Sequence, residues 1–192
     1  MYTDFTSIKT ADLRSWHLKS DTVRVGGKDI IMFTDGQYAD LDPYLPYIYT
    51  PDNDWISIVE HYADMYKSQN LLCEYNDNYC KFNKKCSDVQ VNYGNADFSV
   101  SVYDEFSRLH IRIKAEDLLI SGDNVGDNSD TCYLAIFRGV LGYEHTYQLG
   151  NLMMKDYYVS YDMTPYDERN LDYIQVSIAP QKSEDVIGVQ HY

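Results

Sequence analysis

The residue best placed for chemistry is Asp42, within residues 39–51, which read Ala-Asp-Leu-Asp-Pro-Tyr-Leu-Pro-Tyr-Ile-Tyr-Thr-Pro. This pattern predicts an apolar strand, an acidic turn, a second apolar strand and the start of a helix. A turn between two strands holds a carboxylate on a rigid support, as a catalytic aspartate requires. The residues that follow, Pro43 and Tyr44, are not types that usually assist such a carboxylate. The function of the chain therefore depends on whether Asp42 is active.

A helix is expected directly after this turn. Thr50 and Pro51 predict its beginning, with a hydroxyl residue at the cap and a proline in the first turn. Apolar residues then recur at helical spacing. They are Trp55, Ile58, Val59, Tyr62 and Tyr66. We expect this face to pack on the core and to support the segment that carries Asp42.

Most of the remaining chain alternates between apolar and polar residues, which predicts strands buried on one face. Residues 16–33 predict a hairpin that turns at Gly26 and Gly27, and a second turn at Asp35 and Gly36 leads to the strand before Asp42. Residues 149–154 predict a short helix, with Gly150 allowing a close backbone approach. The further predicted strands are residues 89–93, 98–103, 109–114, 133–137, 157–162 and 174–180.

Length and charge limit the classes of function. A chain of 192 residues forms one domain, or one large lobe of something bigger. Its 16 basic and 30 acidic residues give a net charge of −14, which argues against nucleic acid or an anionic membrane as a partner. No apolar run approaches about 20 residues, so we expect no membrane span. Because the first residues lack the features of a signal peptide, the chain is either a mature form or part of a longer one.

The four cysteines are Cys73, Cys80, Cys86 and Cys132. Their spacing does not form the paired Cys-x-x-Cys of a zinc site, and two disulfides are the favoured interpretation. Cys73 and Cys80 can close a small loop. Disulfides predict an oxidising compartment, so the expected location is secreted, extracellular or lumenal, as in a vacuole or a lysosome-like compartment.

No cofactor or metal site is predicted. Residues 122–130 contain Asp123, Asp127 and Asp130, but their spacing does not match an EF-hand, so we expect a solvated acidic loop. The five histidines are scattered, and there is no glycine-rich phosphate loop. The 20 tyrosines suit half-buried β surfaces and interfaces, because each offers a large area with a polar tip.

The order of the motifs resembles the C-terminal lobe of a pepsin-like aspartic protease over nearly the whole chain. Residues 39–42 fall where that family has its second apolar-apolar-Asp-Thr-Gly motif. Residues 148–162, which include Leu149 and Gly150, are similar to the family's apolar-Leu-Gly run that ends in Tyr-Tyr-x-x-aromatic-Asp. Residues 178–180 resemble its closing Gly-aromatic-Ala-Pro, with Ser177 where glycine is usual.

This resemblance implies a fold and a disulfide. The expected fold class is mostly β, a single lobe over residues 1–192 built from a double-psi-type β-barrel or sheets with a few short helices. Cys86 and Cys132 match the larger disulfide of the family's lobe, which would stabilise the fold by about 3–4 kcal/mol.

The resemblance also implies a mechanism for which this chain supplies only one of the two catalytic residues. Family members use two aspartates, one from each lobe, that share a proton and a water. This chain supplies only Asp42, and Pro43, Tyr44 and Leu45 replace the Thr/Ser-Gly-Thr/Ser that should follow it. Pro43 fixes φ and lacks an N–H, Tyr44 is bulky where two lobes should touch, and Leu45 has no hydroxyl. The expectation is a catalytically inactive pseudoenzyme, with Asp42 a turn residue.

A lobe that folds alone exposes apolar surface beside Asp42, which marks an interaction site. We expect a structural or binding module that self-assembles or docks on another subunit, and head-to-tail contacts would give a filament. The alternative is the C-terminal half of an active two-chain or homodimeric aspartic endopeptidase, completed by an N-terminal lobe or a second copy. The predicted interface residues are Pro43, Tyr44, Leu45, Tyr47 and Leu149.

Overall fold

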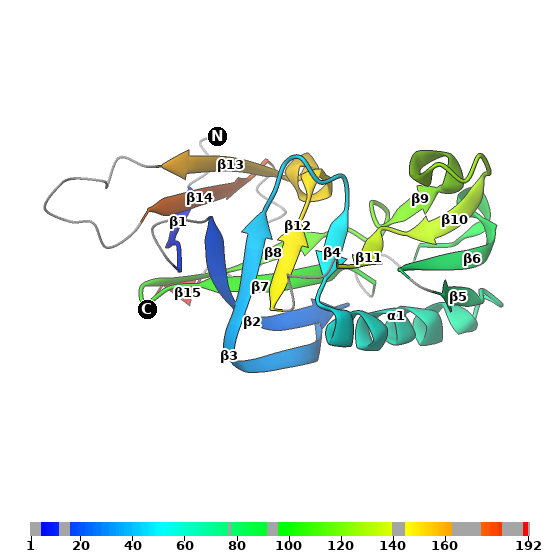
Figure 1. Ribbon diagram of the computed structural model, residues 1–192, viewed down its shortest axis with the longest axis horizontal. Helices are drawn as coiled ribbons and strands as arrows, with labels where there is room; N and C mark the ends of the chain where they lie inside the picture. The colour runs from blue at the N-terminus through cyan, green and yellow to red at the C-terminus, as the bar shows by residue number, and fades with distance from the viewer. Residues whose placement is uncertain are drawn as a thin grey trace, which may run out of the picture.

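The computed structural model describes residues 5–11, 16–76, 78–91, 96–139, 145–162, 174–181 and 190–191. Within them the fold is mostly β, as the alternating pattern predicts, and the strands form sheets of three, four and eight strands (Figure 1). The eight-stranded sheet carries the segment that leads into Asp42, so it is the support of the candidate site.

The two smaller sheets lie at opposite ends of the long axis in Figure 1. The three-stranded sheet has the order β1-β14-β13, and the four-stranded sheet has the order β5-β6-β10-β9. The strands of the first are β1 (Thr6–Lys9), β14 (Gln175–Pro180) and β13 (Tyr157–Asp162). Those of the second are β5 (Cys73–Asn76), β6 (Tyr79–Lys85), β10 (Thr131–Leu134) and β9 (Leu119–Ser121).

The eight-stranded sheet has the order β11-β4-β12-β3-β2-β7-β8-β15. β12 is parallel to β3 and antiparallel to β4, so it lies between two strands that are consecutive along the chain. This is a ψ-type crossing, and the loop from β3 to β4 has to pass around the end of β12. The strands are β11 (Ile136–Arg138), β4 (Ile48–Thr50), β12 (Thr146–Leu149), β3 (Lys28–Leu41), β2 (His17–Val25), β7 (Phe98–Tyr103), β8 (Ser107–Ile113) and β15 (Gln190–His191).

The predicted hairpin is present, but the predicted second turn is wrong. β2 and β3 join through Gly26 and Gly27, which have φ of 60° and 79°, a conformation that glycine adopts without strain. The expected turn at Asp35 and Gly36 is absent because β3 runs unbroken from Lys28 to Leu41. Gly36 (φ 79°) instead lies where the register with β2 shifts, so the strand bulges rather than reverses.

The helix α1 (Asp52–Lys67) buries all five predicted apolar residues. Its beginning differs from the prediction, because the cap residue is Pro51 and no side chain caps the helix. Thr50 belongs to β4, and its buried hydroxyl has no hydrogen-bond partner among the described residues. The helix is fixed to β11 by Trp55, whose Nε1 donates to the carbonyl oxygen of Ile136 at 3.2 Å.

Three short 3₁₀ helices complete the described part of the chain: η1 (Cys86–Asp88), η2 (Gly122–Val125) and η3 (Asn151–Lys155). The helix expected at residues 149–154 therefore begins later, since Leu149 ends β12. The predicted strand at residues 89–93 is wrong for residues 89–91, which follow η1 as irregular chain, and residues 92–93 lie outside the described residues.

Two disulfides tie the four-stranded sheet together. Cys73–Cys80 joins β5 to β6, and Cys86–Cys132 joins η1 to β10. Both pairs agree with the predictions, which rest on the short spacing of Cys73 and Cys80 and on the family resemblance for Cys86 and Cys132. The sequence separations are 7 and 46 residues, so the second bridge closes much the longer loop. No helix in the described ranges is long and apolar enough to cross a membrane.

Candidate functional site

Asp42 follows directly on the last residue of β3, and its backbone is held from both sides. Its N–H donates to the carbonyl oxygen of Leu149 at 3.1 Å, which extends the pairing of β3 with β12. Its own carbonyl oxygen accepts the N–H of Leu45 at 3.2 Å, which closes a tight turn. The sheet therefore places this aspartate at a rigid position, as its place between two strands predicts.

The carboxylate of Asp42 accepts a hydrogen bond within its own turn. Oδ1 accepts the backbone N–H of Tyr44 at 2.9 Å, which is an Asx turn. Pro43 fits the position between them, because it has no N–H to satisfy and its φ is fixed. The side chain of Tyr44 is 94% exposed, so it projects from the tip of the turn into solvent.

The backbone at Gly150 holds the loop that follows Asp42 through hydrogen bonds and a close approach. Its N–H donates to the carbonyl oxygen of Tyr47 at 3.0 Å, and the N–H of Asn151 donates to that of Leu45 at 2.6 Å. A Cβ on Gly150 would lie 2.3 Å from the Tyr47 oxygen and 2.4 Å from the Leu45 oxygen. The predicted close backbone approach is thus confirmed, and it fixes the path of the loop.

The predicted interface residues do not all reach the surface. Pro43 and Tyr44 are exposed, whereas Leu45 and Tyr47 are half-buried. Leu149 is fully buried, so its prediction as an interface residue is wrong. The reason is the ψ-type crossing, which places β12 between β3 and β4 with all four of its residues buried.

Tyr47 is occupied within the chain. Its hydroxyl donates to the carbonyl oxygen of Asn124 in η2 at 2.8 Å, and its ring centroid lies 5.1 Å from that of Phe137. Burial raises the pKa of Tyr47 above its usual value. These contacts join the loop after Asp42 to η2 and β11, so Tyr47 helps to hold the loop rather than presenting a free face.

A polar group that the sequence analysis missed lies beside Asp42. Asp40 is half-buried, and its Oδ2 lies 3.6 Å from Nε2 of His17 on β2. Burial raises the pKa of Asp40, against the lowering effect of His17, and the charge of Asp42 raises it further. The period of two along a strand could have shown that Asp40 and Asp42 share a face. The sequence could not show the pairing with His17, because that pairing depends on the register between β2 and β3.

Tyr161 on β13 completes this group. Its hydroxyl donates to the carbonyl oxygen of Leu41 at 2.6 Å. Burial raises its pKa to about 12, with smaller contributions from the charges of Asp40 and Asp42. The tyrosine therefore stays protonated and anchors the end of β3 as a hydrogen-bond donor.

The three aspartates of the acidic loop around η2 are exposed, as expected, and one of them is also held by hydrogen bonds. Lys81 Nζ donates to Oδ2 of Asp127 at 2.8 Å, and the hydroxyl of Tyr133 donates to the same oxygen at 2.7 Å. Hydrogen bonds from these two groups and from Ser129 lower the pKa of Asp127 to about 2. A group of three or more His, Cys, Asp or Glu arranged to hold a metal ion does not occur among the described residues.

The family model for eukaryotic aspartyl protease matches residues 1–169. The chain belongs to that family. The fold is a single lobe of the pepsin-like aspartic-protease type, which confirms the resemblance inferred from the motifs.

Among solved structures, the lobe is similar to the crystal structure of basic 7S globulin from soybean, with a TM-score of 0.66 and 13% sequence identity. The match covers 92% of this aspartic-protease lobe but 42% of the globulin chain, so the lobe spans less than half the length of that protein. At this identity the likeness shows the fold alone. No curated protein matches the chain.

Proposed function

We propose that this aspartic-protease lobe, spanning residues 1–192, is non-catalytic and serves as a structural or protein-binding module. The observation that supports this most directly is the hydrogen bond from the Tyr44 N–H to the Asp42 carboxylate at 2.9 Å. Here the aspartate at the family's catalytic position stabilises a turn. Pro43, Tyr44 and Leu45 stand where the family's Gly and hydroxyl residues would support a shared pair of carboxylates.

Catalysis in this family requires a second carboxylate close enough to share a proton with the first. The neighbouring carboxylate within the described residues is Asp40, which comes from the same strand and faces His17. The mechanism needs its second aspartate from another lobe, and the ring of Tyr44, 94% exposed, projects from the turn where that lobe would have to pack.

The exposed turn is also the proposed contact surface. Tyr44 offers a large, two-torsion side chain with a polar tip, a type that is enriched at protein interfaces. The partner is either another copy of this chain or a complementary N-terminal lobe, and repeated head-to-tail contacts between copies would build a filament. Two disulfides fit an extracellular or lumenal location for such a module.

A cleavage assay tests the catalytic side of the proposal. The purified protein and the Asp42→Asn variant are incubated with an unfolded protein at acidic pH, with and without an aspartic-protease inhibitor. We expect the same background for both proteins, unchanged by the inhibitor. Inhibitor-sensitive cleavage that disappears in Asp42→Asn would sink the proposal and favour the two-chain or homodimeric endopeptidase.

Light scattering over a range of concentrations tests self-assembly. We expect particles larger than the 22.4 kDa monomer, and we expect Tyr44→Ser to reduce their mass. Tyr158→Ser is the matched control, because Tyr158 is 53% exposed and lies on β13, outside the turn. A monodisperse monomer at every concentration, or equal effects of the two substitutions, contradicts assembly through Tyr44.

A further inference from the structure

Three of the six arginines in this acidic chain lie on two strands of the eight-stranded sheet that are separated by β7: Arg24 on β2, and Arg108 and Arg112 on β8. Arg24 on β2 is the register partner of Ser99 on β7, which in turn is the partner of Arg112 on β8. Arg108, His110 and Arg112 are spaced two residues apart along β8, so their side chains lie on the same face of the sheet. The face therefore has cationic side chains on its two flanking strands and a small serine between them.

This arrangement leaves a cavity of about 180 Å³ on the sheet. Ser99 forms part of its lining between the two arginines, and the turn residues Gly26 and Gly27 contribute no side chains. The full set of lining residues is Arg24, Gly26, Gly27, Asp97, Ser99, His110 and Arg112. The volume is sufficient for a ligand of a few heavy atoms.

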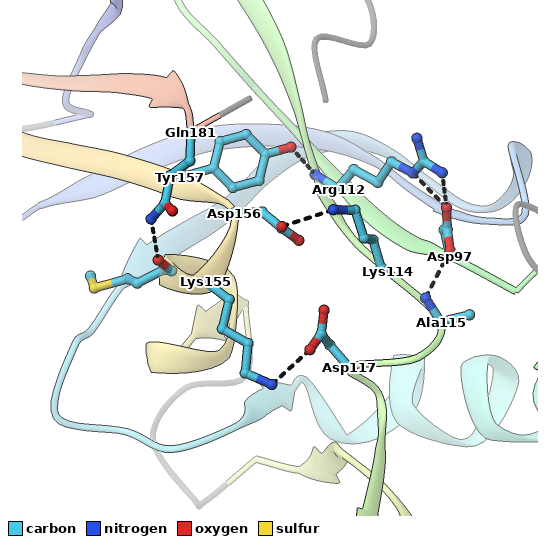
Figure 2. A network of polar contacts seen from close by, with 10 residues as sticks. Asp97, Arg112, Lys114, Ala115, Asp117, Lys155, Asp156, Tyr157 and Gln181 are labelled. Atoms are coloured by element: carbon cyan, nitrogen blue, oxygen red, sulfur yellow. Dashed lines mark hydrogen bonds and ion pairs between the residues drawn. The ribbon is translucent and has the colours of Figure 1, made fainter. Parts of the chain in front are cut away.

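Carboxylates orient both guanidinium groups of the cavity. Asp97 pairs with Nη2 of Arg112 and accepts hydrogen bonds from its Nε at 2.5 Å and from the backbone N–H of Ala115 at 2.8 Å (Figure 2). Arg24 donates from Nε to Asp29. A guanidinium has five N–H groups, so each arginine retains donors beyond these contacts.

The imidazole of His110 supplies a further donor. Nη1 of Arg24 lies 3.3 Å from Nε2 of His110, and because a guanidinium only donates, Nε2 must be the acceptor. The proton of the neutral ring is then on Nδ1, which is buried and has no hydrogen-bond partner among the described residues. Nε of Arg108, two residues earlier on the same face, is also buried without a partner among the described residues, but Arg108 does not line the cavity and its Nη2 pairs with Asp21. Buried donors of this kind require an acceptor.

We propose that this cavity binds a small oxyanion, a free carboxylate or phosphate-type ion, between Arg24, Arg112 and His110. An oxyanion supplies the acceptor that Nδ1 of His110 lacks, and guanidinium groups recognise it with two parallel hydrogen bonds. The net charge of −14 and the carboxylates nearby oppose the ligand, so the expected dissociation constant is about millimolar and rises with salt. This proposal is independent of the one concerning Asp42.

The pKa of His110 provides a specific readout of anion binding, because charged groups surround this ring. Burial lowers the pKa of this ring, Arg24 and Arg108 lower it further, and Asp21 and Asp29 act in the opposite direction. A bound oxyanion beside the ring stabilises the imidazolium, so binding must raise the pKa of His110. Simple screening of the protein's charge by salt would affect the other histidines as well.

The test is an NMR titration of the purified protein with inorganic phosphate and, separately, with acetate, at constant ionic strength set by chloride. We expect saturable shifts of the Ser99 and Arg112 amides and an upward shift of the His110 pKa. Comparing the two titrations shows whether the site prefers a tetrahedral or a planar oxyanion. No saturation with either anion, or the same shifts with chloride alone, overturns the proposal.

Two variants with matched controls locate the site. Ser99→Glu places a carboxylate between the arginines and should weaken binding at least tenfold, whereas Ser160→Glu makes the same change at an exposed position of β13 and should leave it within twofold. Arg24→Gln should weaken binding about fivefold, and Arg138→Gln, which removes an arginine paired with Asp52 on α1, should not. Unchanged binding in Arg24→Gln overturns the proposal even if Ser99→Glu fails to fold.

Discussion

The carboxylate of Asp42 accepts the backbone N–H of Tyr44 at 2.9 Å, so the aspartate closes the turn that it begins. Asp42→Ala removes this acceptor and should lower the free energy of unfolding by about 1 kcal/mol. Asp42→Asn keeps an oxygen in the same place and should cost less than half as much. Urea unfolding of the three proteins measures both changes. If asparagine is as costly as alanine, the charge rather than the turn determines the role of Asp42.

Gly150 is the tightest backbone contact of the site. Gly150→Ala places a Cβ 2.3 Å and 2.4 Å from two carbonyl oxygens, which belong to the backbone and cannot rotate away. We expect a loss of at least about 3 kcal/mol in the free energy of unfolding, because the loop must move or strain. The melting temperature and the urea midpoint should both fall.

Gly27→Ala is the control for this prediction. Gly27 has a φ of 79°, but no heavy atom lies within 4 Å of the position that a Cβ would take there, so only the backbone strain remains. That strain costs about 1 kcal/mol. Equal losses in the free energy of unfolding for the two variants would mean that the backbone around Gly150 moves to accommodate a Cβ.

The sequence predicts the strands and the helix well because their periodicity is local. The alternation in β7 and β8 and the apolar face of α1 are each visible within one segment. The motif at Leu149 and Gly150 adds the family and the close approach of the backbone. What no local pattern shows is that β12 inserts between β3 and β4, which lie far from it along the chain.

The errors follow from that limit. The motif around Leu149 predicts a surface position near the aspartate, yet the crossing buries this residue completely. Asp40, His17 and Tyr161 gather beside Asp42 only because three strands from different parts of the chain meet there. Asp-Gly is a common turn pair and so predicts a turn at Gly36, but pairing with β2 on both sides of the bulge keeps the strand continuous.

The two disulfides should differ in their effect on stability. Replacing Cys86 and Cys132 by serine opens a loop with a sequence separation of 46. It should lower the free energy of unfolding by about 4 kcal/mol, because the unfolded chain gains conformational entropy. Replacing Cys73 and Cys80, with a separation of 7, should cost about 2 kcal/mol. Urea unfolding of the two double variants gives the comparison. A larger loss for the shorter loop would show that contacts in the folded state outweigh the loop length.

The half-buried carboxyl of Asp40 predicts a pH dependence of stability. Burial raises its pKa above 3.8, so in the window between 3.8 and the higher folded value the folded state binds more protons than the unfolded state. Stability therefore falls as the pH rises through this window. Asp40→Asn removes the ionisation, so relative to the natural protein the variant should gain stability from pH 3 to pH 7.

Glu105→Gln provides a control of opposite sign. The hydrogen bond from Lys9 lowers the pKa of Glu105 below 4.5, so its contribution is present above that value and is lost as the pH falls. This variant should therefore lose stability relative to the natural protein as the pH rises. Urea midpoints measured between pH 3 and pH 7 show how the stability of each variant, relative to the natural protein, changes with pH. A flat or negative slope for Asp40→Asn would mean that the ion pair with His17 outweighs the burial of the carboxyl.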